Sequence, residues 1–417
     1  MNKKNLTKGT ITIVAVALFI SISGYVKQSE TKLDDKGSTS KGVKAVVNAN
    51  NQFAFELYSK YKKEYKDENI FFSPYSISVA LTMTYEGAKG QTAKEMESVF
   101  HIPKNANLRK PNFAKIINEL NKKNKKYKLS TANALWPQIG FQLLKEYQNT
   151  IKSYYGGKVT CLDYAGNAEK SRQIINGWVE DKTEDKIKDL IPPDVLGANT
   201  VLVLTNAIYF KGTWATQFDK KNTREENFTT SSGNTVKVPV MRLTDEDAKF
   251  NYAETKDLQI LELPYKGEEL SMLILLPKQS DVNVIEESIT TEKISEYRNN
   301  LQKTQIDIYI PKFKFETKYF MKKTLAEMGM PTAFRPGADF SGINGKGGIW
   351  IDKVIHQAFV EVNEEGTEAA AATAVIMIEK KMVIRKKFRA DHPFIFIIQQ
   401  KDSGNILFLG RVSDPTK

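Results

Sequence analysis

Residues 364–378 have the sequence EEGTEAAAATAVIMI, and EKKM follows at residues 379–382. The four consecutive alanines favour a helix, whereas Gly366 interrupts its start and the later Thr, Val and Ile residues favour a strand. In an extended chain alternate side chains share one face, so odd-numbered residues 367–377 would form a row that is small at first and apolar at its end. Such a strand can enter the middle of an existing sheet, because its leading residues meet little steric resistance and every residue adds ladder hydrogen bonds or apolar burial.

Three segments of the chain are together similar to one known family. The alanine-rich stretch is followed by FRADHPFIFII at residues 388–398 and by ILFLGRV at residues 406–412. In this combination they resemble the serpins, and the resemblance extends from about Val46 to the C-terminus. It implies an α+β serpin fold with three β-sheets, about eight or nine helices and a reactive-centre loop exposed above the sheets.

Length and composition allow a large core. The chain has 417 residues, of which 41% are hydrophobic, and no repeat or linker divides the part after residue 45. We therefore expect a single serpin domain over residues 46–417. The formal net charge of +12 favours anionic partners without indicating a fold.

The N-terminal residues have the pattern of an export signal. Three lysines precede an apolar stretch at residues 11–22, which is short for a transmembrane helix, and small residues at positions 21, 23 and 24 offer a cleavage site. We expect residues 1–24 to be a signal peptide, with an uncleaved membrane anchor as the alternative. Residues 25–45 are expected to be a polar linker. The protein is then secreted and extracellular, or lies at the cell surface if the segment is retained.

Two apolar segments are predicted to be strands of the main sheet. Residues 200–210 have the sequence TVLVLTNAIYF, a nearly continuous apolar run that is typical of a strand covered on both faces. Residues 354–362 are the predicted strand that leads into the alanine-rich stretch. Helical spacing of apolar residues predicts a helix over residues 46–65, and Ser73 followed by Pro74 predicts the start of another.

Few residues suit catalysis or metal binding. The sequence has only three histidines, and it lacks a paired-histidine metal motif, a nucleophile elbow and a P-loop. Cys161 is the single cysteine, so an intrachain disulfide is excluded, and its apolar surroundings predict a buried thiol. We expect neither an enzyme nor a metal site nor a cofactor; a hydrolase that pairs Cys161 with a histidine is the weakest alternative. Motifs for nucleic-acid binding are missing, so no such partner is expected.

The resemblance implies an inhibitory mechanism. A target protease cleaves the loop, forms an acyl-enzyme and is trapped when the cut loop inserts into the main sheet as a new strand. A lysine suits trypsin-like serine proteases, whose specificity pocket contains a carboxylate. In inhibitory serpins the residue before the cut bond lies fourteen after the hinge glycine, which gives Lys380, with Lys381 and Met382 as second and third candidates. The hinge itself comprises Glu365, Gly366, Thr367, Glu368, Ala369, Ala370, Ala371 and Ala372.

The resemblance also assigns residues that control opening of the main sheet. Ser73, Ser76, Asn206 and His356 match the shutter, a polar cluster beneath the point where the sheet parts; a static core cluster is the alternative. Asn206 and His356 interrupt apolar strands, so their buried polar groups need mutual hydrogen bonds. Trp214 matches the breach, where the loop enters the sheet, although it could equally be an ordinary core aromatic.

A basic run lies in a region where some serpins bind polyanions such as heparin. It consists of Lys122, Lys123, Lys125, Lys126 and Lys128. Solvated lysines without a ligand are the alternative, because runs of charge commonly form a hydrated surface.

We expect a monomer that inhibits trypsin-like serine proteases. One alternative is a non-inhibitory serpin-fold carrier or chaperone, and another is an inhibitor that traps cysteine proteases as well. Thr367 and residues 369–372 are small, whereas non-inhibitory members tend to have bulky, charged or proline residues in the hinge. The small hinge residues therefore favour inhibition.

Overall fold

The computed structural model describes residues 32–122, 125–244, 249–367 and 385–417. The predicted signal peptide, the hinge residues 368–372 and the predicted cut site at Lys380, Lys381 or Met382 lie outside these residues. Residues Leu33–Lys417 form one compact unit. Among the described helices, none combines the length and apolar character needed to cross a membrane.

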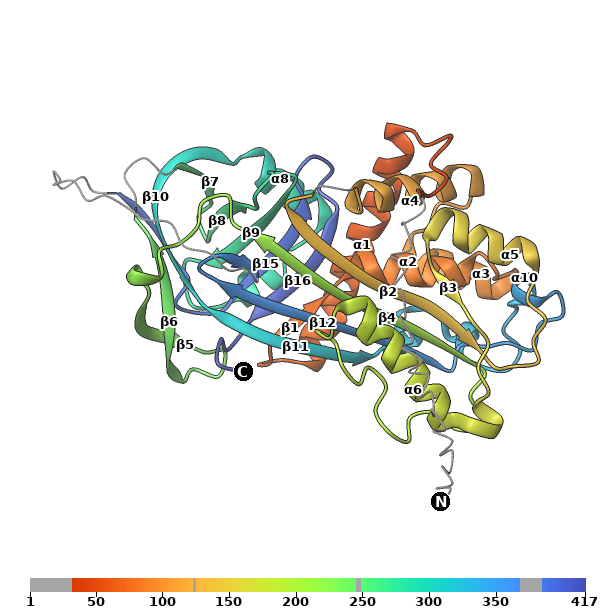
Figure 1. Cartoon of the computed structure of the whole chain (residues 1–417). Helices are drawn as coiled ribbons and strands as arrows, with labels where there is room; N and C mark the ends of the chain where they lie inside the picture. Colours follow the sequence, from red (N-terminus) through yellow and green to blue (C-terminus); the bar gives the residue numbers. More distant parts are fainter. Residues whose placement is uncertain (1–31, 123–124, 245–248, 368–384) are drawn as a thin grey trace, which may run out of the picture. The chain divides into compact units, whose positions relative to one another are not determined.

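Six strands form the sheet that contains the two predicted apolar strands (Figure 1). Their order is β11 (Phe313–Phe320), β12 (Lys353–Asn363), β13 (Gly366–Thr367), β4 (Leu202–Thr213), β2 (Tyr127–Pro137) and β3 (Lys158–Val159). The apolar runs at 200–210 and 354–362 are β4 and β12, and most of their residues are buried. The sequence prediction of two central strands is therefore confirmed.

A second, ten-stranded sheet contains the C-terminal strands. Its order is β1 (Ile70–Phe72), β16 (Ile406–Val412), β15 (Phe394–Gln400), β9 (Leu270–Pro277), β8 (Leu258–Pro264), β7 (Lys249–Glu254), β10 (Gln302–Pro311), β6 (Thr235–Leu243) and β5 (Arg224–Thr229), with β14 (Lys386–Arg389) paired to β10. The first part of β10 pairs with β7, and the second part pairs with β14 and β6. The three predicted sheets thus correspond to the six-stranded sheet and to two parts of the larger sheet that share β10.

The described residues contain ten α-helices, of which α7 and α10 have four residues each. They are α1 (Ser40–Glu64), α2 (Pro74–Tyr85), α3 (Gly90–Phe100), α4 (Ala106–Leu120), α5 (Lys145–Thr150), α6 (Tyr164–Thr183), α7 (Asn283–Glu286), α8 (Thr291–Asn299), α9 (Lys322–Met328) and α10 (Ser341–Asn344). Helix α1 begins earlier than predicted, because the Thr39 hydroxyl accepts a hydrogen bond from the Gly42 amide and caps it. The end of the predicted linker, residues 40–45, therefore belongs to this helix.

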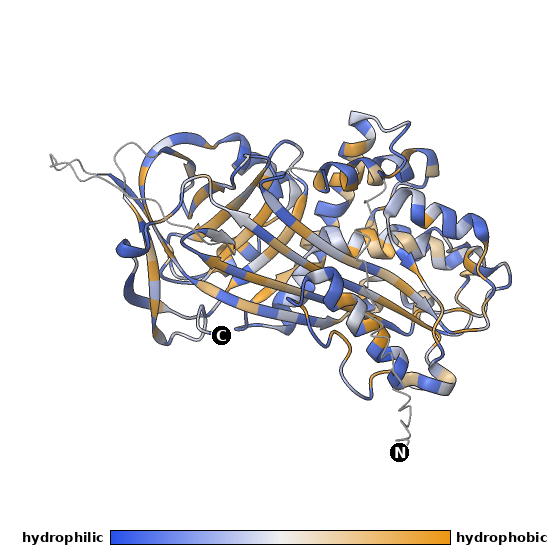
Figure 2. Ribbon diagram, viewed as in Figure 1, coloured by the Kyte–Doolittle hydropathy of each residue, from blue (hydrophilic) through white to orange (hydrophobic). Residues whose placement is uncertain are grey.

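Helices cover both faces of the six-stranded sheet. On one face, α6 packs on β2 and β4 through a separate apolar cluster that includes Trp136 and Ile175. On the other face, α1, α2 and the ten-stranded sheet share the main core. Figure 2 shows the strands as alternating hydrophobic and hydrophilic bands where one side faces solvent, and as continuously hydrophobic bands where both sides are covered.

Candidate functional site

Strand β13 lies between β12 and β4 at one end of their contact. Thr367 pairs with Val362 of β12 and with Gly212 of β4. Farther along, residues 353–359 of β12 pair directly and in parallel with residues 203–209 of β4. The sheet is therefore parted where the alanine-rich stretch begins and closed beyond that point. A strand that prolonged β13 would have to replace the direct pairing of β12 with β4.

Thr367 is the last described residue before the hinge alanines, and it is already inside the sheet. Its side chain is buried, and its hydroxyl is 2.8 Å from the Tyr265 hydroxyl. The Tyr265 ring stacks on Trp214 with ring centroids 4.6 Å apart. Trp214 in turn donates its indole N–H to the Asn363 carbonyl at 3.0 Å. Trp214 thus contacts the chain where it turns from β12 into β13, and its role at the breach stays a prediction.

Gly366 is required by the close approach of β13 to β4. Its φ of +148° is one that residues with a side chain rarely adopt. A Cβ atom at this position would lie 2.1 Å from the Gly212 carbonyl oxygen. Any side chain would therefore push β13 out of the sheet.

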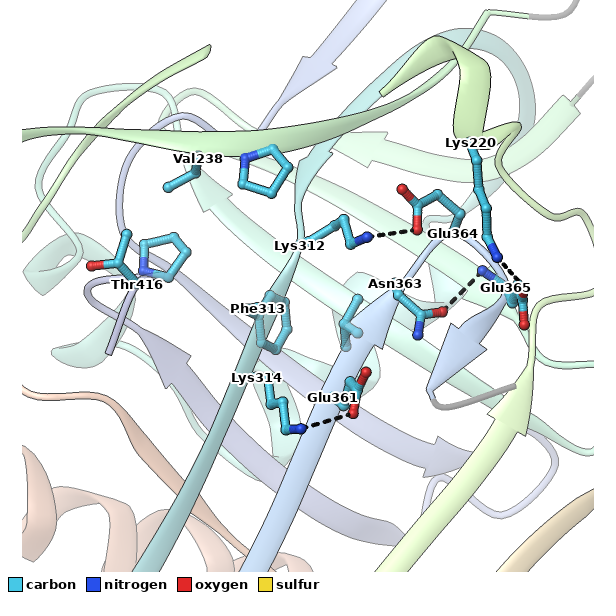
Figure 3. A pocket seen from close by; sticks show the side chains of 13 residues that line it. Lys220, Val238, Lys312, Phe313, Lys314, Glu361, Asn363, Glu364, Glu365 and Thr416 are labelled. Carbon is cyan, nitrogen blue, oxygen red and sulfur yellow. Dashed lines mark hydrogen bonds and ion pairs between the residues drawn. The ribbon is translucent and has the colours of Figure 1, made fainter. Parts of the chain in front are cut away.

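Two carboxylates at the start of the hinge are buried and paired with lysines (Figure 3). Lys312 Nζ is 3.0 Å from Glu364, and Lys220 Nζ is 2.5 Å from Glu365. The Thr223 hydroxyl also donates to Glu364 at 2.8 Å. Burial raises the pKa of Glu364, but hydrogen bonds from the backbone, Thr223 and Lys312 outweigh it and hold that pKa below its usual value.

These ion pairs line a hollow of 340 Å³ between the end of β12, the start of β11 and β6. Within the described part of the chain, the second carboxylate oxygen of Glu365 is buried without a hydrogen-bond partner. Lys312 and Lys220 reach the hinge from different elements, β10–β11 and the short 3-10 helix at residues 220–222. The start of the hinge is consequently fixed to both sides of the parted sheet.

The predicted shutter residues meet at the closed part of the sheet. His356 is fully buried, and its Nε2 accepts a hydrogen bond from the Ser73 amide at 3.1 Å. Its Nδ1 therefore carries the proton and donates to the Asn206 side-chain oxygen. Ser73 Oγ donates to the Leu407 carbonyl at 2.6 Å and accepts from the Ser76 amide. Burial lowers the pKa of His356 to about 3, so the ring is neutral at physiological pH.

Asn133 completes this cluster and was missed by the sequence analysis. It lies on β2 directly opposite Asn206 of β4, and its side-chain oxygen accepts hydrogen bonds from Asn206 and from Ser76. Its position in a predicted strand, between two alanines, was the available signal. The cluster therefore joins three elements, β2, β4 and β12, to the beginning of α2.

The sequence model of the family described as serpin, or serine protease inhibitor, matches residues 48–415. This chain belongs to the serpin family. It is 44% identical over 372 residues to an uncharacterized serpin-like protein of Methanosarcina acetivorans, covering 89% of this chain and 86% of that protein. It is 41% identical over 389 residues to Serpin B4 of Homo sapiens, covering 88% of this chain and 98% of that protein.

Solved serpin structures have the same fold. Uncleaved ovalbumin superposes with a TM-score of 0.80 at 30% identity, covering 89% of this chain and all of ovalbumin. Human thyroxine-binding globulin in complex with its ligand gives a TM-score of 0.82 at 30% identity, covering 90% of this chain and all of the globulin. The family and the fold predicted from the sequence are confirmed.

The predicted polyanion site of this serpin is only partly open. Lys123 lies outside the described residues, while Lys122 and Lys126 are exposed. Lys125 forms an ion pair with Glu269, and Lys128 forms one with Glu184. Two of the four described lysines are thus already neutralised by carboxylates of the same chain.

The remaining candidates for chemistry have structural partners. His101 Nε2 is 3.0 Å from the Glu56 carboxylate, and His392 contacts Asp391 and the Pro277 carbonyl. Cys161 is half-buried rather than fully buried as predicted, and burial raises the pKa of its thiol, which disfavours the reactive thiolate. Across the described ranges, no group of His, Cys, Asp and Glu side chains has the arrangement of a metal site.

Proposed function

We propose that this serpin is a secreted inhibitor that traps trypsin-like serine proteases, with Lys380 as the residue before the cut bond. The observation that carries the proposal is the double pairing of β13. Gly366 and Thr367 already have strand partners on both sides, while β12 and β4 remain paired with each other farther along. Residues 368–378 could therefore extend β13 between these two strands, with Glu368 first and the four alanines at 369–372 next.

Insertion of the cut loop lowers the free energy of the chain. About a dozen residues would gain ladder hydrogen bonds, at roughly 0.5 kcal/mol net each, so the gain is several kcal/mol before apolar burial is counted. Val375 and Met377 lie on the face predicted to turn inward and would add burial. The uncut protein is then held in its native form by a kinetic barrier.

The covalent step uses the protease's own chemistry. The protease serine attacks the Lys380 carbonyl, the amine of Lys381 leaves with a proton from the protease histidine, and an ester links the two proteins. Insertion then pulls the ester and the protease along the sheet. Because loss of one oxyanion-hole donor slows acyl transfer about a hundredfold or more, distortion of that hole leaves the ester unhydrolysed.

The proposal is tested by mixing the full chain with trypsin and analysing the products by denaturing gel and mass spectrometry. We expect an SDS-resistant adduct of the two proteins and a released peptide that begins at Lys381. Lys380→Ala should slow adduct formation with trypsin, and Lys381→Ala is the matched control. Cleavage without any adduct would contradict the proposal. Papain in a parallel reaction tests whether cysteine proteases are trapped as well.

The proposed export and polyanion binding have separate tests. N-terminal sequencing of the protein recovered from the medium or from membranes distinguishes a cleaved signal at residues 1–24 from a retained anchor. A heparin column compares the chain with a variant in which Lys122 and Lys126 are changed to alanine, since Lys125 and Lys128 form ion pairs with carboxylates of the same chain. Earlier elution of the variant supports a polyanion site.

A carrier is the second candidate function, and a large hollow favours it. The hollow has a volume of 1410 Å³ and lies between α1, α8 and the turn at residues 402–404. Its lining combines apolar side chains such as Phe55 and Ile294 with the partly buried guanidinium of Arg298. Titration with thyroxine, the ligand of the structurally similar globulin, provides a direct test. Saturable binding together with a failure to form adducts would favour the carrier over the inhibitor.

A further inference from the structure

The outer face of β14 and its neighbours carries a group of basic side chains. Phe388 of β14 is buried, so the residues at odd positions on either side of it point away from the core. In the strand pairing, Lys387 lies beside Asp307 of β10, and Arg389 lies beside Tyr309 of β10. Tyr309 lies beside Arg242 of β6 on its other side. We call this surface the basic face, and it comprises Arg385, Lys387, Arg389, Arg242, Asp307, Tyr309 and Glu226.

The basic face is held in a defined arrangement. Glu226 of β5 accepts hydrogen bonds from both Arg242 and Arg389. Both guanidinium groups also lie against the Tyr309 ring, at 6.0 Å and 4.1 Å from its centroid. Side chains fixed in this way lose little conformational entropy when a partner binds.

Positive charge remains in excess on this face. It has four cations against two carboxylates, because Glu226 is shared by two arginines and Asp307 is paired with Arg385. Lys387 is exposed, and its side chain has no hydrogen bond or ion pair to any residue that the structure describes. A partner that covered this face would therefore need negative charge to match it.

The basic face lies close to the proposed cut site. Lys380 precedes Arg385 by five residues, which span at most about 18 Å even when fully extended. A protease domain of about 230 residues is roughly 45 Å across. A protease bound at Lys380 must consequently extend over the strands adjacent to β14.

We propose that the basic face is a secondary docking surface for a protease that is acidic beside its substrate cleft. The inference rests on the proposed function and refines it by naming the surface chemistry of the target. Opposite charges on the two surfaces accelerate the encounter and bring the cleft onto the loop. The target is thus distinguished from other trypsin-like proteases by a surface outside its specificity pocket.

The test compares anionic and cationic trypsin, which share the specificity pocket and differ in surface charge. Association rates are measured at low ionic strength for the full chain and for Lys387→Glu. We expect the full chain to react faster with anionic than with cationic trypsin. The association rate of Lys387→Glu with anionic trypsin should be about three- to tenfold lower than that of the full chain. The difference should disappear at about 1 M salt, where charges are screened within about 3 Å.

Lys346→Glu is the matched control, because Lys346 is exposed in the loop after α10 and the substitution changes net charge equally. Figure 1 shows α10 far from β10 and β6. Equal effects of the two substitutions on the association rate, or no effect of Lys387→Glu with either trypsin, would contradict the proposed docking surface. Neither result would contradict the proposed inhibition, which is tested by adduct formation. Absence of an adduct with both trypsins would overturn the proposed function and this inference together.

Discussion

The contact between β12 and β4 has two ends that are held together by different interactions. At the parted end, the chain is fixed by ion pairs from Lys312 and Lys220, whose side chains reach water. At the closed end, neutral His356 and Asn206 are buried and hydrogen-bonded to each other. Water can replace the first set of interactions as they break, but it cannot reach the second set until the sheet has opened. In the proposed mechanism, the parted end acts on the first residues that enter the sheet, and the closed end sets the barrier to insertion.

A charged side chain at the parted end should have the largest effect on loop insertion. Thr367→Arg places a guanidinium where the hydroxyl of a buried threonine now contacts Tyr265. Because a buried unpaired charge costs several kcal/mol, the guanidinium should leave the sheet together with β13 and would have to return for the loop to insert. We therefore expect adduct formation with trypsin to fall by about a hundredfold or more, with cleavage unimpaired. The ratio of cleaved chain to adduct on a denaturing gel measures the effect.

Thr367→Ser is the control for this substitution, because it keeps the hydroxyl and adds no volume. It should form adducts as the unaltered chain does. Full inhibition by Thr367→Arg would show that the hinge does not enter the sheet through β13.

Acidification should weaken the closed end. The pKa of His356 is about 3 in the folded protein and about 6.5 when unfolded, so the unfolded chain takes up the proton more readily. Stability is then complete above about pH 6.5 and is lost as the pH falls toward 3, by up to about 1.4 kcal/mol per pH unit. Urea unfolding at several pH values measures this slope, and His356→Gln should make it shallower. An identical slope in the variant would assign the acid sensitivity to other groups.

Removal of an amide from the shutter should have a smaller but clear effect. Asn206→Ala leaves the Nδ1–H of His356 and the oxygen atoms of Ser76 and Asn133 without their present partner. We expect the free energy of unfolding to decrease by about 2 kcal/mol, which is the usual cost of unsatisfied buried polar groups. Asn299→Ala, at an exposed position in α8, should change it by less than about 0.5 kcal/mol.

The two lysines at the parted end should contribute differently to the stability of the native form. The Lys312 side chain is 36% exposed and that of Lys220 is 68% exposed, while both partner carboxylates are buried. Lys312→Ala should therefore destabilise the native form by about 1 kcal/mol, and Lys220→Ala by less. Thermal unfolding of the two variants side by side measures the difference. A larger effect of Lys220→Ala would show that side-chain exposure does not rank the two ion pairs.

The sequence predicted the strands of this site better than their arrangement. A nearly continuous apolar run such as residues 200–210 is typical of a strand that is covered on both faces. The residues of β4 alone therefore predicted this strand. Which strand lies beside it depends on contacts between residues far apart in the chain. The parallel pairing of β12 with β4, interrupted by β13, has no local signal of that kind.

The same limit explains the residues that were missed. Asn133 is one polar residue in a predicted strand, and only its register opposite Asn206 makes it part of the shutter. Glu226 and Arg242 lie on consecutive strands, but Arg389 follows Glu226 by 163 residues, so the basic face could not be predicted before the sheet was known. The start of α1 was also missed, because residues 40–45 include two lysines and a glycine, and the cap at Thr39 precedes the first run of apolar residues.

The position of β15 and β16 has a consequence for how the chain is made. These strands follow all the other described strands in the chain, yet they lie between β9 and β1, with almost every residue buried. Until residue 412 has been synthesised, β9 and β1 have unpaired edges and the larger sheet cannot close. Residues 368–382, which contain the proposed reactive loop, precede both strands in the chain and are synthesised before this sheet is complete. We therefore expect a translational pause before residue 394 to favour chains that misfold.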